Sequence, residues 1–163
     1  MSEIVEATPD QVSSLATRYE RIAQQLAGLF IKNADPLARM ATAAAVLHHK
    51  QPHFFWTGFY RMHDGLLQAA AYQGPLACSP LEPGRGVCWA CWERNAGIIV
   101  PDVEDFPGHI PCDSRSRSEV VAPVRDASGD CVAVLDVDST ELSAFCEDDL
   151  RGLQRIAGMI YDS

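Results

Sequence analysis

The sequence predicts an α+β domain with a mainly antiparallel central sheet and helices packed on it. Apolar residues recur at helical spacing in the first fifty residues and near the end of the chain. Between them, paired segments of strand-forming residues flank short turn sequences. Strands joined by tight turns pair antiparallel, and helices before and after them cover the sheet. At 163 residues, the chain is expected to form a single domain, 1–163.

Two helices are predicted in the helical segment, about residues 8–50. Thr8-Pro9-Asp10 has the form of an N-cap followed by proline at the first helical position, and Asp35-Pro36 repeats this signal before a helix that stops ahead of Gln51-Pro52. We expect both helices to cover one face of the sheet. The apolar positions of the first are Val12, Leu15, Tyr19, Ile22, Leu26 and Leu29, and those of the second are Leu37, Met40, Ala41, Ala44 and Leu47.

Two hairpins are predicted in the sheet region, about residues 53–140. The first turns at Asp64-Gly65, and the second turns around residues 126–130. The expected strands are 54–60, Leu66–Tyr72, Ile98–Val100, Glu119–Val124 and Cys131–Val137. A short helix from residues 84–86 to about Asn95 and a long loop, Asp102 to Arg117, separate the hairpins. A helix over about 147–161 closes the domain, with acids in its first turn.

Charge and hydropathy limit the possible partners. The net charge of −9 opposes a polyanion whose phosphates must be neutralised by Lys and Arg, so DNA or RNA is not expected as a partner. The start of the chain has no basic segment followed by an apolar one, and Met40–Leu47 is too short to cross a bilayer. We expect a cytoplasmic protein without membrane segments. Cysteines in such a protein more often serve catalysis, redox chemistry or metal binding than permanent disulfides.

Three cysteines lie in sequence contexts that suit chemistry. Cys112 sits in a polar loop, where His109 would favour the reactive thiolate and Asp113 would oppose it. Cys88 lies near the start of the short helix, where free amide groups stabilise a thiolate. Cys78 follows a turn, in a place suited to approaching another sulfur. Each is also compatible with an ordinary loop or helix position.

The other cysteines have weaker signals. Cys91 completes a Cys-x-x-Cys with Cys88, which suggests redox or zinc chemistry, but no second such pair or His pair follows at metal spacing. Cys91 is equally well explained as a core residue. Cys131 starts a strand, and Cys146 precedes the last helix at a position where Ser or Thr would be the better cap.

Acidic and aromatic side chains suggest a small-ligand pocket. Asp136 and Asp138 share one face of a strand, about 7 Å apart, and a buried acid needs a partner, a proton or a cationic ligand. Glu119 opens the adjacent strand and would join them if the strands pair. Trp56 and Tyr60 share a face of the first strand, as a pocket wall or as core aromatics. This combination suits a small ligand that carries an ammonium group.

These residues belong to motifs that resemble one family, the free methionine-(R)-sulfoxide reductases, which are built on a GAF domain. The resemblance runs from about Ala34 to the end of the chain. The motifs are Trp56-Thr-Gly-Phe-Tyr60, Tyr72-Gln-Gly-Pro-Leu-Ala-Cys78, Gly84-Arg-Gly-Val-Cys88, Val100-Pro-Asp-Val, Phe106-Pro-Gly-His-Ile-Pro-Cys112-Asp-Ser, Ser118-Glu119 and Val134-Leu-Asp-Val-Asp-Ser139.

The resemblance implies reduction of free L-methionine (R)-sulfoxide. Cys112 would attack the sulfoxide sulfur while Glu119 gives a proton to the departing oxygen, which leaves a sulfenic acid on Cys112. A second thiol then forms a disulfide, with Cys78 the preferred resolving residue and Cys88 an auxiliary thiol. A thioredoxin-type reductant would reopen the disulfide.

The resemblance also assigns the binding residues. Asp136 and Asp138 would hold the substrate ammonium, and Trp56 and Tyr60 would enclose its methyl-sulfur end. No metal or organic cofactor is implied, and a homodimer is expected from the family. The segment Trp89-Ala-Cys91-Trp92 departs from the family pattern of small residues, and it allows Cys91 to trap Cys88 in a disulfide.

Two alternatives remain open from the sequence. A GAF module that senses a small molecule without catalysis is the main one, although the chain shows no output domain and acids suit a phosphate ligand poorly. The second is a structural zinc protein that uses Cys88, Cys91, Cys112 and His109 as ligands.

Overall fold

The computed structural model describes the chain from residue 9 to residue 162, with side chains described from residue 14 onward. It has the predicted α+β class, with ten elements along the chain. The helices are α1 (Pro9–Phe30), α2 (Pro36–Lys50), α3 (Gly86–Arg94) and α4 (Glu147–Ala157), with a short 3-10 helix, η1 (Val103–Asp105). The predicted cap at Thr8 and the side chain of Val12 lie outside the described residues.

Five strands form one sheet in the order β2-β1-β5-β4-β3, and every neighbouring pair is antiparallel. The strands are β1 (Trp56–His63), β2 (Leu66–Gln73), β3 (Ile98–Val100), β4 (Ser118–Arg125) and β5 (Cys131–Ser139). Both predicted hairpins are confirmed. At the first turn, Asp64 and Gly65 have φ values of 52° and 76°, the left-handed backbone that favours these two residue types in a tight hairpin turn.

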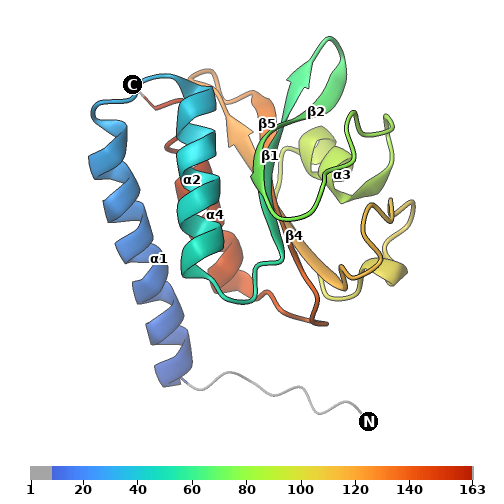
Figure 1. Cartoon of the computed structure of the whole chain (residues 1–163), viewed down its shortest axis with the longest axis horizontal. Helices are drawn as coiled ribbons and strands as arrows, with labels where there is room; N and C mark the ends of the chain where they lie inside the picture. The colour runs from blue at the N-terminus through green and yellow to red at the C-terminus, as the bar shows by residue number, and fades with distance from the viewer. Residues whose placement is uncertain (1–8, 163) are drawn as a thin grey trace.

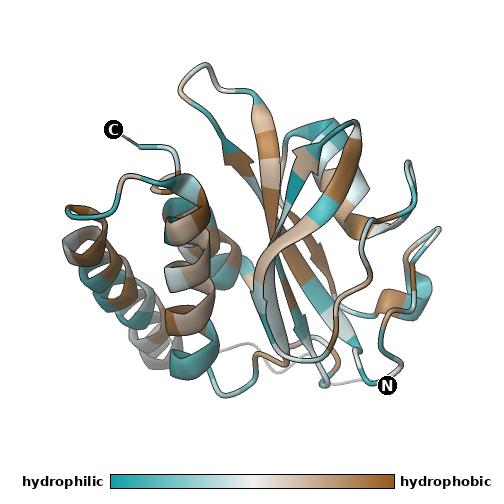
Figure 2. Ribbon diagram, turned by 45° about the horizontal axis from the view of Figure 1, so that its top comes forward, coloured by the Kyte–Doolittle hydropathy of each residue, from teal (hydrophilic) through white to brown (hydrophobic). Residues whose placement is uncertain are grey.

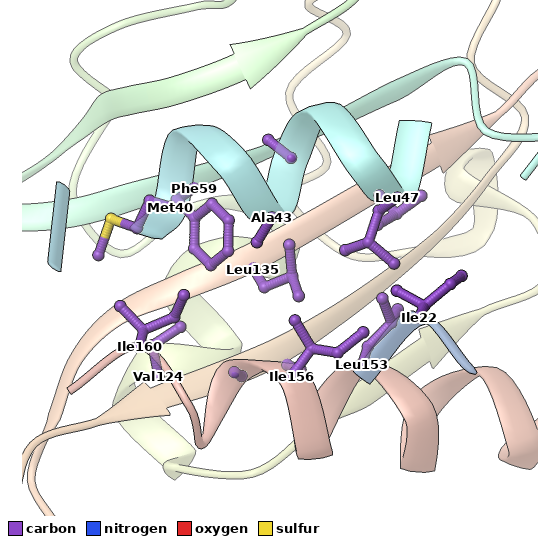
Figure 3. Close-up of a cluster of buried hydrophobic side chains, with 14 of the residues drawn as sticks. Ile22, Met40, Ala43, Leu47, Phe59, Val124, Leu135, Leu153, Ile156 and Ile160 are labelled. Atoms are coloured by element: carbon purple, nitrogen blue, oxygen red, sulfur yellow. The ribbon is translucent and has the colours of Figure 1, made fainter. Parts of the chain in front are cut away.

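The elements form layers on both sides of the sheet. Figure 1 shows α1, α2 and α4 on one side and α3 on the other. The main core lies between the sheet and the three helices, where Leu135 of β5 packs among residues of α2 and α4 such as Ala43 and Ile156 (Figure 3). Helix α1 packs chiefly on α4 and α2. The expectation that both early helices cover the sheet is therefore confirmed for α2, while α1 forms an outer layer.

The apolar stripes of the helices differ from the prediction at three positions. Leu29 is 47% exposed, because the buried stripe of α1 follows Ile22 and Leu26 to Phe30. In α2, Leu37 is 39% exposed and Ala41 is also exposed, while Ala43 takes a place in the core. The last helix ends at Ala157, four residues before its predicted end, and residue 158 caps it.

The second face of the sheet carries a smaller core under α3 and the loops before and after it. Its buried residues include Tyr60, Val121 and Val134 from the sheet and Trp89 from α3. The central strands carry long hydrophobic stretches, because they are covered on both faces (Figure 2). Within the described part of the chain, no helix combines the length and apolar character that crossing a bilayer requires.

Candidate active site

A cavity of about 70 Å³ lies on the α3 side of the sheet. One water needs roughly 10–15 Å³, so the space suits a small molecule. Strands β1, β4 and β5 supply its floor, and α3 with the loops 74–85 and 107–117 supply its walls. All eight residues that the sequence singled out line it: Trp56, Tyr60, Cys78, Cys88, Cys112, Glu119, Asp136 and Asp138.

Strand pairing brings the three acids together. Glu119 of β4 lies opposite Asp138 of β5, and Asp136 follows two residues away on the same face. Side chains directly opposite in an antiparallel pair have Cβ atoms about 5 Å apart. The predicted meeting of Glu119 with the two aspartates is therefore confirmed as a position, whereas its role as a proton donor stays a prediction.

The acids share a buried, negative environment. Burial raises the pKa of Glu119 well above its usual range, and the charges of Asp136 and Asp138 raise it further. Burial also raises the pKa of Asp136, but hydrogen bonds from Glu119 and Cys88 favour its ionised form. Burial and the charge of Asp136 also raise the pKa of Asp138 well above its usual range. Glu119 is thus an acid that keeps a proton, and Asp136 is the carboxylate that accepts from it. The Oδ1 atom of Asp136 is buried without a hydrogen-bond partner, so it is available to a cationic group in the cavity.

Aromatic rings form one wall of the cavity. The Trp56 indole stacks on Tyr60, with ring centroids 5.5 Å apart and planes 22° apart, and on Tyr72 at 5.3 Å and 19°. Its Nε1 donates to the carbonyl oxygen of Pro75 at 3.1 Å, which fixes the ring and the loop after β2 together. Tyr72 was quoted in a motif but was not predicted to lie against the site.

Gly58 is a residue that sequence reasoning missed. A Cβ atom at this position would lie 2.3 Å from the Cβ of Tyr72 and 2.7 Å from the ring of Trp56. Gly58 therefore lets the Trp56 indole lie over β1. Gly58 is also the cross-strand neighbour of Asp136. The available signal was the glycine between Trp56 and Tyr60, because glycine inside a strand often marks a close approach.

Cys78 and Cys112 form a disulfide across the mouth of the cavity, with Cα atoms 5.7 Å apart. The bond joins the loop after β2 to the loop before β4. Cys112 is exposed and Cys78 is half-buried. The bond joins the pair that the family resemblance preferred, Cys112 with Cys78, across a sequence separation of 34 residues.

The surroundings of Cys112 differ from the local sequence expectation. Burial lowers the pKa of His109, so this side chain is neutral at pH 7 and supplies no positive charge. Asp113 pairs with Arg115 through contacts of 2.8 and 3.0 Å, which hold the pKa of Asp113 at about 2. Arg115 also lies over the ring of Phe55, 4.8 Å from its centroid. The charge of Asp113 is therefore paired with that of Arg115.

Cys88 is not the activated thiol that its place near a helix start suggested. Burial raises its pKa well above the usual range, and Asp136 and Glu119 add to the shift. The helix amides act only near the first turn, and here desolvation and two acids outweigh them. Cys88 therefore stays a protonated thiol whose S–H faces Asp136.

The remaining cysteines are free thiols. Cys91 is fully buried in the smaller core, which fits its interpretation as a core residue. Cys131 donates to the carbonyl oxygen of Ala133 at 3.2 Å, and Cys146 is exposed at the start of α4. The zinc set that the sequence left open is not assembled among the described residues, because Cys112 is in the disulfide and Cys91 faces the core.

Comparisons with known proteins agree with this geometry. The model of the GAF domain family matches residues 37–160. The free methionine-R-sulfoxide reductase of Escherichia coli is 36% identical over 124 residues, which cover 76% of this chain and 74% of that protein. This chain belongs to the GAF-domain family of free methionine-R-sulfoxide reductases. The resemblance and the fold inferred from the sequence motifs are confirmed.

Two further relatives extend the match of this reductase-family chain. The crystal structure of a free methionine-R-sulfoxide reductase from Neisseria meningitidis in complex with its substrate is 36% identical and has a TM-score of 0.85. It covers 96% of this chain and 90% of its own. GAF domain-containing protein A of Dictyostelium discoideum is 42% identical, over 88% of this chain and 90% of its own length.

The unusual α3 segment of this family member does not trap its thiols. Trp89 and Trp92 pack edge to face, with centroids 5.5 Å apart and planes 78° apart. Cys88 and Cys91 are both unbonded, since they point to different surroundings, the cavity and the apolar core. The Cys88–Cys91 disulfide that the sequence allowed is not formed in the structure.

Proposed function

We propose that this protein reduces free methionine (R)-sulfoxide to methionine through a thiol cycle. One observation supports this most directly. A disulfide between Cys78 and Cys112 closes the rim of a cavity whose floor holds a proton-bearing acid, Glu119. That arrangement is the expected oxidised product of one reaction cycle.

The first step transfers oxygen from the substrate to Cys112. The Cys112 thiolate attacks the sulfoxide sulfur, and Glu119 protonates the oxygen as its bond to that sulfur weakens. The products are methionine and a sulfenic acid on Cys112, so the thiol has lost two electrons and the substrate sulfur has gained them. The raised pKa of Glu119 keeps a proton available for this step near neutral pH.

The second step regenerates the thiol. Cys78 attacks the sulfenic sulfur of Cys112, the S–S bond forms, and the oxygen leaves as water. A thioredoxin-type dithiol then reduces this disulfide. The exposure of Cys112 supports access by a protein reductant, whereas Cys88 is only 5% exposed beneath the loops. A homodimer and a cytoplasmic location remain predictions.

Selectivity for the free amino acid follows from charge. Asp136 and Asp138 would bind the substrate ammonium, and the unpartnered Oδ1 of Asp136 supports this assignment. Trp56 and Tyr60 would enclose the methyl-sulfur end. A methionine sulfoxide inside a peptide has an uncharged amide nitrogen in place of the ammonium, so it loses the partner of both acids.

The substrate assay uses purified protein with dithiothreitol. We expect consumption of free methionine (R)-sulfoxide, with little turnover of the (S) epimer or of the sulfoxide inside a peptide. Equal rates with the peptide would refute the account of selectivity. Ligand binding without any turnover would instead favour a sensor.

The roles of the cysteines are tested by serine variants in the same assay. Cys112→Ser should abolish even a single turnover. When a thioredoxin-type reductant replaces dithiothreitol, Cys78→Ser should release one equivalent of methionine per chain, and turnover should then stop. Cys146→Ser is the matched control, because this exposed thiol lines no part of the cavity. An unchanged steady-state rate for Cys78→Ser would assign the resolving role to Cys88.

A further inference from the structure

The proposed thiol cycle leaves Cys88 without a task. It is 5% exposed, lies outside the Cys78–Cys112 disulfide, and keeps its thiol in the oxidised protein. Yet its side chain lines the cavity beside Glu119 and Asp136. The Sγ atom of Cys88 and a carboxylate oxygen from each of the two acids all lie within 4.8 Å of one another. Within the described part of the chain, this is the single group of three such ligand atoms.

Each of the three groups comes from a different rigid element. Cys88 is on α3, Glu119 is on β4, and Asp136 is on the central strand β5. A donor set held by a helix and two paired strands keeps its geometry without a ligand. The three groups therefore converge because of the fold and not because of a local turn.

A second observation points to a ligand at this group. The Oδ1 atom of Asp136 is buried and has no hydrogen-bond partner, although the residue is only 5% exposed. No ion pair in the described part of the chain involves Glu119 or Asp136. A buried carboxylate oxygen in that situation normally has a proton donor or a positive charge beside it.

We propose that Cys88, Glu119 and Asp136 form a binding site for one zinc ion, which occupies the cavity in place of the substrate. One thiolate and two carboxylates suit Zn²⁺, while Mg²⁺ and Ca²⁺ prefer oxygen ligands alone. Tetrahedral zinc with bonds of about 2.0–2.3 Å places its ligand atoms roughly 3.3–3.8 Å apart. Small side-chain shifts reach this spacing from the observed arrangement, and a water in the cavity completes the fourth position.

The bound ion would make zinc a reversible inhibitor of the reductase, an effect that rests on the proposed function. Zinc would neutralise the acid that receives the substrate ammonium and would occupy the acid that donates the proton. Zinc displaces the protons that Cys88 and Glu119 hold, and they pass to the solvent as the thiolate and the carboxylate bind the ion. No electrons move, because Zn²⁺ has no accessible redox state. The substrate and the ion would thus exclude each other from one cavity.

The binding test uses the oxidised protein, in which the Cys78–Cys112 disulfide removes both redox thiols as ligands. Titration calorimetry with Zn²⁺ should show one ion per chain, and Co²⁺ should give a thiolate-to-metal absorption band. Cys88→Ala and Asp136→Asn should each weaken binding by about 100-fold or more, since a lost ligand costs at least as much as a lost supporting contact. Cys91→Ala is the matched control on the same helix and should bind like the parent.

Two results would overturn the proposal. One is the absence of zinc binding at micromolar concentration, and the other is binding that survives Cys88→Ala, which would place the ion on other thiols. Single-turnover assays with prereduced protein, freed of dithiothreitol because it chelates zinc, test the inhibition. Zinc should raise the substrate concentration that gives half-maximal rate. Sulfoxide reduction without zinc binding would refute only this proposal, and zinc binding without sulfoxide reduction would refute only the proposed function.

Discussion

The proton-donor role of Glu119 gives the sharpest prediction for the chemical step. Glu119→Gln keeps the shape of the side chain and removes its transferable proton. The side chain is 6% exposed, and burial together with Asp136 raises its pKa, so the native group is largely protonated near neutral pH. Because glutamine is neutral like the protonated acid, the variant should bind the substrate almost as well as the parent.

The expected loss is therefore in kcat. General acid catalysis contributes about 10²–10⁴-fold, which corresponds to roughly 2.7–5.4 kcal/mol of transition-state stabilisation. On the alkaline side of its pH profile, the parent should lose activity as the pH rises through the raised pKa of Glu119, because the proton is then gone. The variant should lack this decline.

The assay is a single turnover of prereduced protein, with release of free methionine measured from pH 5.5 to 9. Asp136→Asn is the contrasting change, since loss of the charge that faces the ammonium should raise KM more than it lowers kcat. A Glu119→Gln rate within threefold of the parent would refute the donor role. So would an effect confined to KM.

Unfolding does not account for such a loss. An unfolded glutamate releases its proton near pH 4.3, whereas the folded Glu119 retains it to higher pH. This group therefore destabilises the fold increasingly as the pH rises from about 4.3 to its raised pKa, and the deficit persists above it. Glutamine does not titrate, so the melting temperature of the variant at pH 8 should equal or exceed that of the parent.

Two further predictions concern the stability of the fold. Gly58→Ala should lower the free energy of unfolding by at least about 1–3 kcal/mol and raise KM, because the new Cβ would displace Trp56. Gly28→Ala, where a Cβ meets open space, should raise the free energy of unfolding by at most ~1 kcal/mol. A Trp56 fluorescence and KM unchanged by Gly58→Ala would contradict this. Arg39 donates to five backbone carbonyls, so Arg39→Ala should lower the unfolding free energy in urea by about 3 kcal/mol. A loss below 0.5 kcal/mol, typical of exposed sites, would contradict it.

Local patterns in the sequence were sufficient for most of the fold. The Asp64-Gly65 turn fixes a hairpin because few other residue pairs adopt its left-handed backbone so readily. The Asp35-Pro36 start signal also holds, since the Asp35 side chain accepts from the backbone of Ala38 at 3.0 Å. Leu29 was misplaced because its position borders the buried stripe. Which edge of that stripe is covered depends on where α4 and α2 pack, and this is not a local property.

The site shows the same division between local and long-range causes. The shared face of Asp136 and Asp138 follows from strand periodicity, and their meeting with Glu119 follows from pairing of adjacent strands. The state of Cys88 does not follow from its neighbours in sequence. A helix start lowers a thiol pKa, but the depth of burial and the two acids are set by strands that arrive more than thirty residues later.

This placement of Cys88 has a consequence for the choice of resolving thiol. A sulfenic acid on Cys112 reacts with the thiol that is both close and able to ionise. Cys88 lines the same cavity, but burial and the adjacent acids raise its pKa and keep it protonated. Cys78 is half-buried in its loop, and its Cα lies 5.7 Å from that of Cys112, within the range that a disulfide spans. The acids that would bind the substrate would thus also restrain the competing thiol, which favours the Cys78–Cys112 disulfide that a reductant can reach.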